Sequence, residues 1–113
     1  MERTGRCRRI SDLRVFGFSA KDVYVAGRKL FHSTGDGQWS AVDVPDLSDA
    51  MAVLGDAQGN LYVGARGGVL FVRKNGTWSH TTDKGAGDYQ ALVLTGDDLY
   101  IGAERFLEWS DPE

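Results

Sequence analysis

The chain has 113 residues, of which 42% are hydrophobic and 11% aromatic, so it is one domain's worth of sequence with enough apolar side chains for a buried core. Its net charge of −3 argues against non-specific binding to nucleic acid, and no segment approaches the roughly 18 consecutive apolar residues of a membrane-spanning helix. The single cysteine, Cys7, excludes an intrachain disulfide and a thiolate metal cage. We expect a soluble, cytoplasmic protein that binds neither nucleic acid nor a membrane. The basic cluster at residues 3–9 is interpreted as a solvated end, with a polyanion contact as the alternative.

Residues 13–50 consist of short apolar runs that are separated by glycine-containing turns. The runs are LRVFGFS, VYVAG, KLFHS and QWSAVDV, and the last of them follows the turn GDG. Short runs rich in Val, Phe and Tyr between turn residues are typical of β-strands. This segment is predicted to form one four-stranded unit.

Residues 51–88 repeat this pattern with the runs MAVLG, LYVGA, VLFVR and TWSHTT. The run LYVGA is apolar at consecutive positions, which indicates a strand buried on both faces. Asn75 and Gly76 separate the last two runs, and this dipeptide favours a type I′ hairpin turn because both central residues then need a positive φ. A second four-stranded unit is predicted here.

Residues 89–113 contain the runs QALVLT, LYIGA and FLEWS. They predict three strands of a third unit, whose fourth strand is missing. No helix of useful length is visible anywhere in the chain, so the expected fold class is all-β.

The three units are copies of one repeat. Tyr24, Tyr62 and Tyr100 recur at one constant interval, and the apolar and small residues that follow them match in the same register. Trp39 and Trp78 recur at nearly the same interval. Four strands per repeat of about 40 residues is the pattern of a β-propeller blade. We expect the small residues after each tyrosine to allow close approach, and the tryptophans to pack between blades.

The segment DAQGNLYVGARGGVLF, residues 56–71, resembles the repeat of the two-component-regulator propellers, which runs Asp-x-x-Gly-Asn-Leu-aromatic-apolar-Gly, then Gly-Gly and an apolar strand. STGDGQW, residues 33–39, is similar to the Asp-box of sialidase-like and photosystem-assembly propellers, with its aspartate displaced. Both resemblances imply a propeller, and the first implies a sensing or signalling context. The residues that match the regulator repeat are Asp56, Gly59, Asn60, Leu61, Tyr62, Gly64, Gly67, Gly68 and Leu70.

Closed propellers contain about four to eight blades, so blade 1 (13–50), blade 2 (51–88) and the incomplete blade 3 (89–113) are too few for a ring. Residues 1–12, and residues 5–10 in particular, are expected to supply the missing strand of a third-type blade. Two copies of the chain would then form a six-bladed homodimer without exposed sheet edges. The alternatives are a fragment of a longer propeller and a three-blade piece completed by a different protein.

Motifs for catalysis or cofactor binding are absent from the sequence. It contains no GxSxG elbow, HExxH, Walker loop or EF-hand loop. His32 and His80 are out of register with the repeat, and no carboxylate repeats beside them. We expect a protein that is not an enzyme and holds no cofactor or metal.

Arg28, Arg66 and Glu104 are the candidate binding residues. They follow the second strand of successive copies at the same interval as the tyrosines, in the turn to the third strand, and are expected on one face of the ring. Turn residues are freer than core residues to carry binding, although a solvated turn is the alternative interpretation.

A second polar set recurs just before the second strand of each copy. It consists of Asp22, Asn60 and Asp98, which share one position in the repeat. Short polar side chains of this kind shape turns by bonding to nearby backbone amides, and we expect that task here.

These features predict a non-catalytic propeller that binds a protein partner through one face, in sensing or signalling or as an inhibitor such as an antidote to a toxin. A lectin-like module that binds one glycan per blade junction is the alternative. A glycosidase would need paired carboxylates near the ring axis, and none occurs in register.

Overall fold

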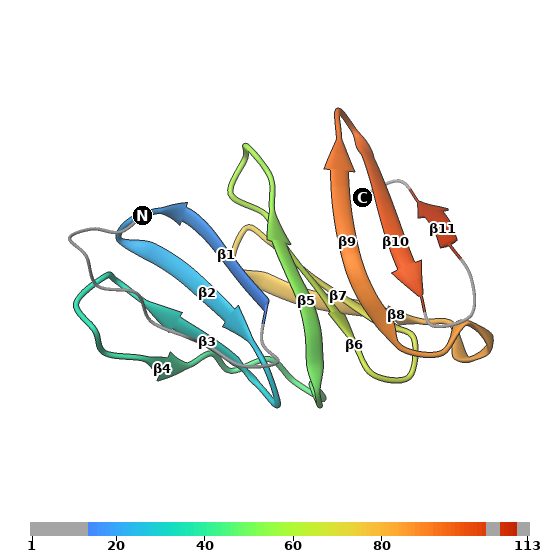
Figure 1. The fold of residues 1–113 in the computed structure, drawn as a ribbon, viewed down its shortest axis with the longest axis horizontal. Coiled ribbons are helices and arrows are strands. Elements are labelled where there is room, and N and C mark those ends of the chain that lie inside the picture. Colours follow the sequence, from blue (N-terminus) through green and yellow to red (C-terminus); the bar gives the residue numbers. More distant parts are fainter. Residues whose placement is uncertain (1–13, 104–106, 111–113) are drawn as a thin grey trace.

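The computed structural model describes residues 14–103 and 107–110, and nearly all of their regular structure is β-strand (Figure 1). The only helix in these ranges is a single 3₁₀ turn at Lys84–Ala86. The strands are β1 (Arg14–Ser19), β2 (Asp22–Ala26), β3 (Leu30–Ser33), β4 (Ser40–Ala41), β5 (Ala50–Gly55), β6 (Leu61–Ala65), β7 (Val69–Lys74), β8 (Thr77–Thr82), β9 (Tyr89–Thr95), β10 (Asp98–Ala103) and β11 (Leu107–Ser110).

The strands form three blade-like antiparallel sheets in chain order. Sheet 1 is β1-β2-β3-β4, sheet 2 is β5-β6-β7-β8, and sheet 3 is β9-β10-β11. This confirms the all-β prediction and the order of the strands within each copy. The expected closing strand at residues 5–10 lies outside the described residues.

Turn chemistry explains where the strands of sheet 2 end. Asn75 and Gly76 both have positive φ, 53° and 77°, as a type I′ turn requires, and this hairpin prediction is confirmed. In sheet 1 the fourth strand is much shorter than predicted. It pairs with β3 at Ser40 and Ala41, and one further backbone bond, from Val42 N to Leu30 O, extends this contact to the first residue of β3.

The register of the strands gives each sheet two distinct faces. We name the face toward the preceding sheet the trailing face and the face toward the next sheet the leading face. Paired residues share a face, so the pairs of the trailing faces are Val15–Val25, Val53–Val63 and Leu92–Ile101. The pairs of the leading faces are Phe16–Tyr24, Leu54–Tyr62 and Val93–Tyr100.

Two apolar cores join the three sheets. The leading face of sheet 1, with Tyr24, packs against Val53 and Val63 of sheet 2. The leading face of sheet 2, with Tyr62, packs against Leu99 and Ile101 of sheet 3. All five residues of β6 are buried, as predicted for a strand that lies between two cores.

The sheets come closest together along their first strands. β1 packs against β5, and β5 packs against β9. In Figure 1 the three sheets lie side by side in chain order, and β4 lies far from sheet 2. Contact along the first strands, with divergence of the later ones, is the arrangement of blades around an axis.

Candidate functional site

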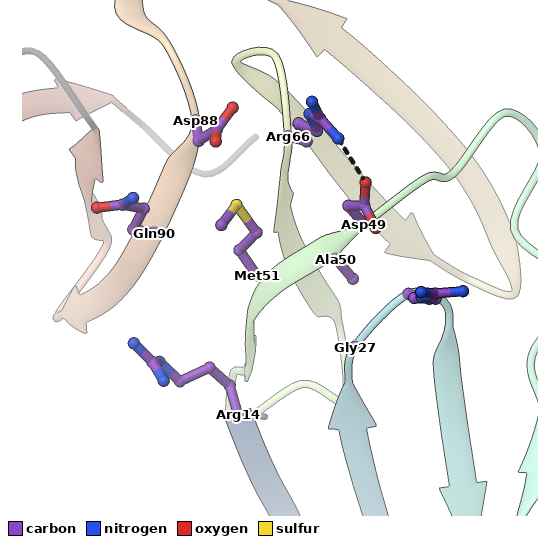
Figure 2. Close-up of a pocket in the computed structure, with 9 residues that line it drawn as sticks. Arg14, Gly27, Asp49, Ala50, Met51, Arg66, Asp88 and Gln90 are labelled. Atoms are coloured by element: carbon purple, nitrogen blue, oxygen red, sulfur yellow. Dashed lines mark hydrogen bonds and ion pairs between the residues drawn. The ribbon is translucent and has the colours of Figure 1, made fainter. Parts of the chain in front are cut away.

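A cavity of about 750 Å³ opens where the first strands begin (Figure 2). Its walls come from the β2–β3 loop, the β6–β7 loop and the segments that lead into β5 and β9. All three sheets therefore contribute to one site. The lining residues are Arg14, Gly27, Arg28, Asp49, Ala50, Met51, Arg66, Asp88 and Gln90.

Backbone hydrogen bonds hold the walls of this cavity at a fixed spacing. Asp49 N donates to Arg28 O at 3.0 Å, and Arg66 N donates to Asp49 O at 3.1 Å. Asp49 thus connects the β2–β3 loop of sheet 1 to the β6–β7 loop of sheet 2. Its φ of 48° lies in the left-handed region, which aspartate tolerates better than most residues.

Two carboxylates hold the β6–β7 loop on either side. Arg66 Nη1 donates to Asp49 Oδ2 at 3.1 Å, and this ion pair is exposed, with 68% and 41% of the two side chains accessible. On the other side Gly67 N donates to Asp88 Oδ1 at 2.9 Å. The loop is therefore tied to the segments that precede both β5 and β9.

Two further guanidinium groups line the cavity. Within the ranges 14–103 and 107–110, the side chains of Arg14 and Arg28 have no ion-pair or hydrogen-bond partner, and both residues are exposed. In Figure 2 the Arg14 side chain extends toward Gln90, and Met51 lies between them and Arg66. The cavity thus offers free positive charge beside an apolar side chain.

The predicted site residues are partly brought together. Arg28 and Arg66 occupy equivalent loops and line the same cavity, as expected for one face of the molecule. Glu104 lies outside the described residues. A role of these residues in binding stays a prediction.

Arg14, Asp49 and Asp88 also line the cavity, and none of them was predicted as a site residue. Asp49 and Asp88 recur at the same interval as Trp39 and Trp78, so the repeat itself carried a signal for them. Arg14 had no such signal, because the equivalent inner-strand positions of the other copies are not basic.

Each of the two histidines contacts an aromatic ring. His32 Nε2 lies 2.7 Å from Asp22 Oδ1, and its ring contacts Tyr24 at 4.6 Å. His80 contacts the ring of Phe71 at 5.2 Å. The described part of the chain contains no group of three His, Cys, Asp or Glu side chains that could hold a metal ion. The expectation that the Asp22 side chain would bond to backbone amides was wrong, since it pairs with His32.

A polar network closes the β5–β6 hairpin at the far end of sheet 2. Asp56 accepts hydrogen bonds from the backbone of Gln58 and Asn60, from the Asn60 side chain and from the Tyr62 hydroxyl, all between 2.9 and 3.0 Å. Burial opposes ionisation of Asp56, but these bonds outweigh it and lower its pKa. Burial and the Asp56 carboxylate raise the pKa of Tyr62 to about 12. Asn60 thus supports its turn through the Asp56 carboxylate rather than through backbone amides, and the role of Asp98 stays a prediction.

The two repeat tryptophans differ in environment. Trp78 is half-buried, packs against the core between sheets 1 and 2, and has the Arg73 guanidinium 5.8 Å from its ring. Trp39 is 45% exposed. Packing between blades is therefore confirmed for Trp78. For Trp39 it stays a prediction, because Trp39 has the position of Trp78 in the repeat and no sheet lies on the trailing face of sheet 1 within the described residues.

Comparison with known proteins bears on the fold alone. No protein-family model and no curated protein matches the chain. The crystal structure of the computationally designed Ika4 protein is similar to it, with a TM-score of 0.65, 16% identity and 85% of this chain covered. This chain spans 63% of the length of that protein. Across the described residues, no helix has the length and apolar character needed to cross a membrane.

Proposed function

We propose that this chain is a non-catalytic β-propeller module that binds a protein partner through the cavity at the start of β1, β5 and β9. In this proposal the three sheets are successive blades around one axis. Contact along their first strands supports that arrangement. The cavity then lies at one mouth of the ring, where several blades contribute to one surface.

The observation that carries the proposal is the gathering of three arginines from two sheets around one cavity. Arg66 is paired with Asp49, while Arg14 and Arg28 have no side-chain partner in the described ranges. Exposed guanidinium groups bind carboxylates through two parallel hydrogen bonds. The partner surface that fits is therefore an acidic segment with an apolar side chain for Met51.

The rigidity of the loops also supports binding. All four wall segments of the cavity are tied by the hydrogen bonds of Asp49 and by the bond from Gly67 to Asp88. A loop that is already ordered loses little conformational entropy on binding, which favours affinity. A protein that binds an acidic partner in this way could act in sensing or signalling, or as an inhibitor of that partner.

Glycan binding is the less favoured proposal for this chain. A lectin with one site per blade junction needs repeated aromatic platforms in similar settings. Trp39 is exposed and Trp78 is half-buried under Arg73, so the two do not form equivalent platforms.

The test compares charge reversal at the cavity with charge reversal at the opposite end of the same strand. Arg28 follows β2 and Lys21 precedes it, and both are exposed. Wild type, R28E and K21E are used as affinity baits in extracts of the cells that make the protein, with quantitative mass spectrometry of what each retains. Proteins retained by wild type and K21E but lost with R28E support the proposal.

Two results would contradict it. The first is a set of retained proteins that does not change with R28E. The second is a glycan-array signal for the wild type that R28E abolishes while no protein is lost, which would assign the cavity to a carbohydrate.

A further inference from the structure

The large exposed hydrophobic side chains on the sheets lie on the two outward-facing sheet faces. Val15, on the trailing face of sheet 1, is 53% exposed. Val93 and Tyr100, on the leading face of sheet 3, are 53% and 36% exposed. Between the sheets, the residues at corresponding positions are covered by the next sheet.

The repeat provides an internal comparison for this exposure. Tyr24, Tyr62 and Tyr100 occupy the same position of the second strand in each sheet. Tyr24 is 6% exposed and Tyr62 is 1% exposed, because sheets 2 and 3 pack on them. Tyr100 differs from them only in having no sheet on its leading face within the described residues.

The glycines after these tyrosines lead to the same conclusion. A Cβ placed on Gly64 would lie 3.1 Å from the Cβ of Tyr89, which belongs to the next sheet. A Cβ placed on Gly102, one repeat later, would have Ala91 of its own sheet as its nearest neighbour, at 3.2 Å from the Ala91 Cβ. The nearest neighbour at Gly64 is thus a residue of the next sheet, whereas at Gly102 it is a residue of the same sheet.

We propose that the leading face of sheet 3 packs on the trailing face of sheet 1 of a second copy of this chain. The inference rests on the propeller arrangement of the proposed function, and it is independent of what the cavity binds. A second copy fits because its trailing face presents Val15 at the position from which sheet 2 presents Val53 to sheet 1. The junction would thus continue the two blade contacts that already exist within the chain.

The geometry of a ring sets the number of copies. Head-to-tail contacts form a closed ring when the rotation per contact completes a circle, and otherwise form filaments. Closed propellers have about four to eight blades, and six is the one multiple of three in that range. Two copies therefore close the ring through two identical junctions, each with Val93 of one copy beside Val15 of the other.

The experiment measures solution mass by light scattering with chromatography, over a wide range of protein concentration. The variants are V15E and V93E, one on each outward face, and the control is K21E, which places the same acidic side chain at an exposed residue of the β1–β2 turn. The wild type and K21E are expected at twice the chain mass of 12.4 kDa. Each face variant is expected to raise the dimer dissociation constant at least about 100-fold, because its carboxylate would be buried without a partner at both junctions. Circular dichroism spectra check that every variant is folded.

Mixing the two variants tests the head-to-tail geometry. A V15E copy keeps its sheet 3 face and a V93E copy keeps its sheet 1 face, so the mixture regains one intact junction and part of the dimer. A face that paired with itself would be disrupted by only one of the two substitutions. That result, a monomeric wild type at all concentrations, or an open series of oligomers would overturn the proposal. R28E keeps the wild-type mass if the ring is correct, which separates a failure of this inference from a failure of the cavity proposal.

Discussion

Arg73 of sheet 2 donates a hydrogen bond from Nη1 to the hydroxyl of Tyr24 in sheet 1 at 3.1 Å, and its guanidinium lies 5.5 Å from the centre of the same ring. This is a polar contact across an otherwise apolar junction. Because Tyr24 is 6% exposed, its hydroxyl has little access to water as a substitute partner.

Removal of this hydrogen bond should weaken the junction of sheets 1 and 2. We expect Y24F to lower the free energy of unfolding by about 1–2 kcal/mol, since Arg73 remains over the ring but loses its acceptor. The measurement is urea denaturation of Y24F, R73M and the double variant. A double variant as destabilised as the sum of the two single variants would contradict the assignment.

Two adjacent glycines of the β6–β7 loop should respond very differently to alanine. Gly67 and Gly68 both have positive φ, 82° and 77°, but a Cβ on Gly67 meets open space whereas one on Gly68 overlaps the carbonyl oxygen of Asp83. We expect G67A to cost about 1 kcal/mol from the left-handed backbone alone. G68A should cost several times more, because the loop must also give up the bond from Asp83 N to Gly68 O. Thermal denaturation of the pair decides this, and similar melting temperatures would be inconsistent with the loop geometry.

The raised pKa of Tyr62 predicts a loss of stability in alkaline solution. Its folded pKa of about 12 lies above the ordinary value of 10, so the folded state favours the protonated phenol. The stability that this provides is fully present below about pH 10 and is lost as the pH rises toward 12. In urea denaturation at alkaline pH, Y62F should show a smaller decline over this interval than the wild type. A parallel decline in both proteins would assign the alkaline loss to other groups.

The lowered pKa of Asp56 predicts a loss of stability in acid solution. Its folded pKa lies below the ordinary value of 3.8, so the stability that its carboxylate provides is present above that value and is lost as the pH falls through the folded pKa. D56N should be less stable than the wild type at neutral pH, and the difference should shrink at low pH. A difference that stays constant from neutral to strongly acidic pH would mean that the charge of Asp56 does not support the hairpin.

Arg66 should matter little for folding. Its ion pair with Asp49 is exposed on both sides, and exposed pairs contribute less than about 1 kcal/mol. We expect R66A to unfold within about 1 kcal/mol of the wild type and with little dependence on salt. This is measured by urea denaturation at low and high salt. A large loss would mean that Arg66 is a structural residue, and its variants could then not be used to test binding.

Local chemistry made much of the fold predictable. Asn75 and Gly76 specify their hairpin by backbone preference alone, and the unbroken apolar run of β6 indicates burial on both faces. Repeat spacing likewise places Arg28 and Arg66 in equivalent loops, since residues in one register share one position in the repeat. These properties depend on neighbours along the chain, so the sequence by itself determined them.

Only the tertiary structure decided which of these repeated positions differ. Trp39 is exposed and Trp78 is half-buried, although the two share a register, because sheet 1 covers the face of sheet 2 that carries Trp78 and no described sheet precedes sheet 1. The position of Arg14 at the cavity, and the exposure of Val93 and Tyr100, likewise depend on which sheet lies opposite. Contacts between residues far apart in the chain leave no periodic pattern in the sequence. They could therefore be identified only from the packing of the sheets in the structure.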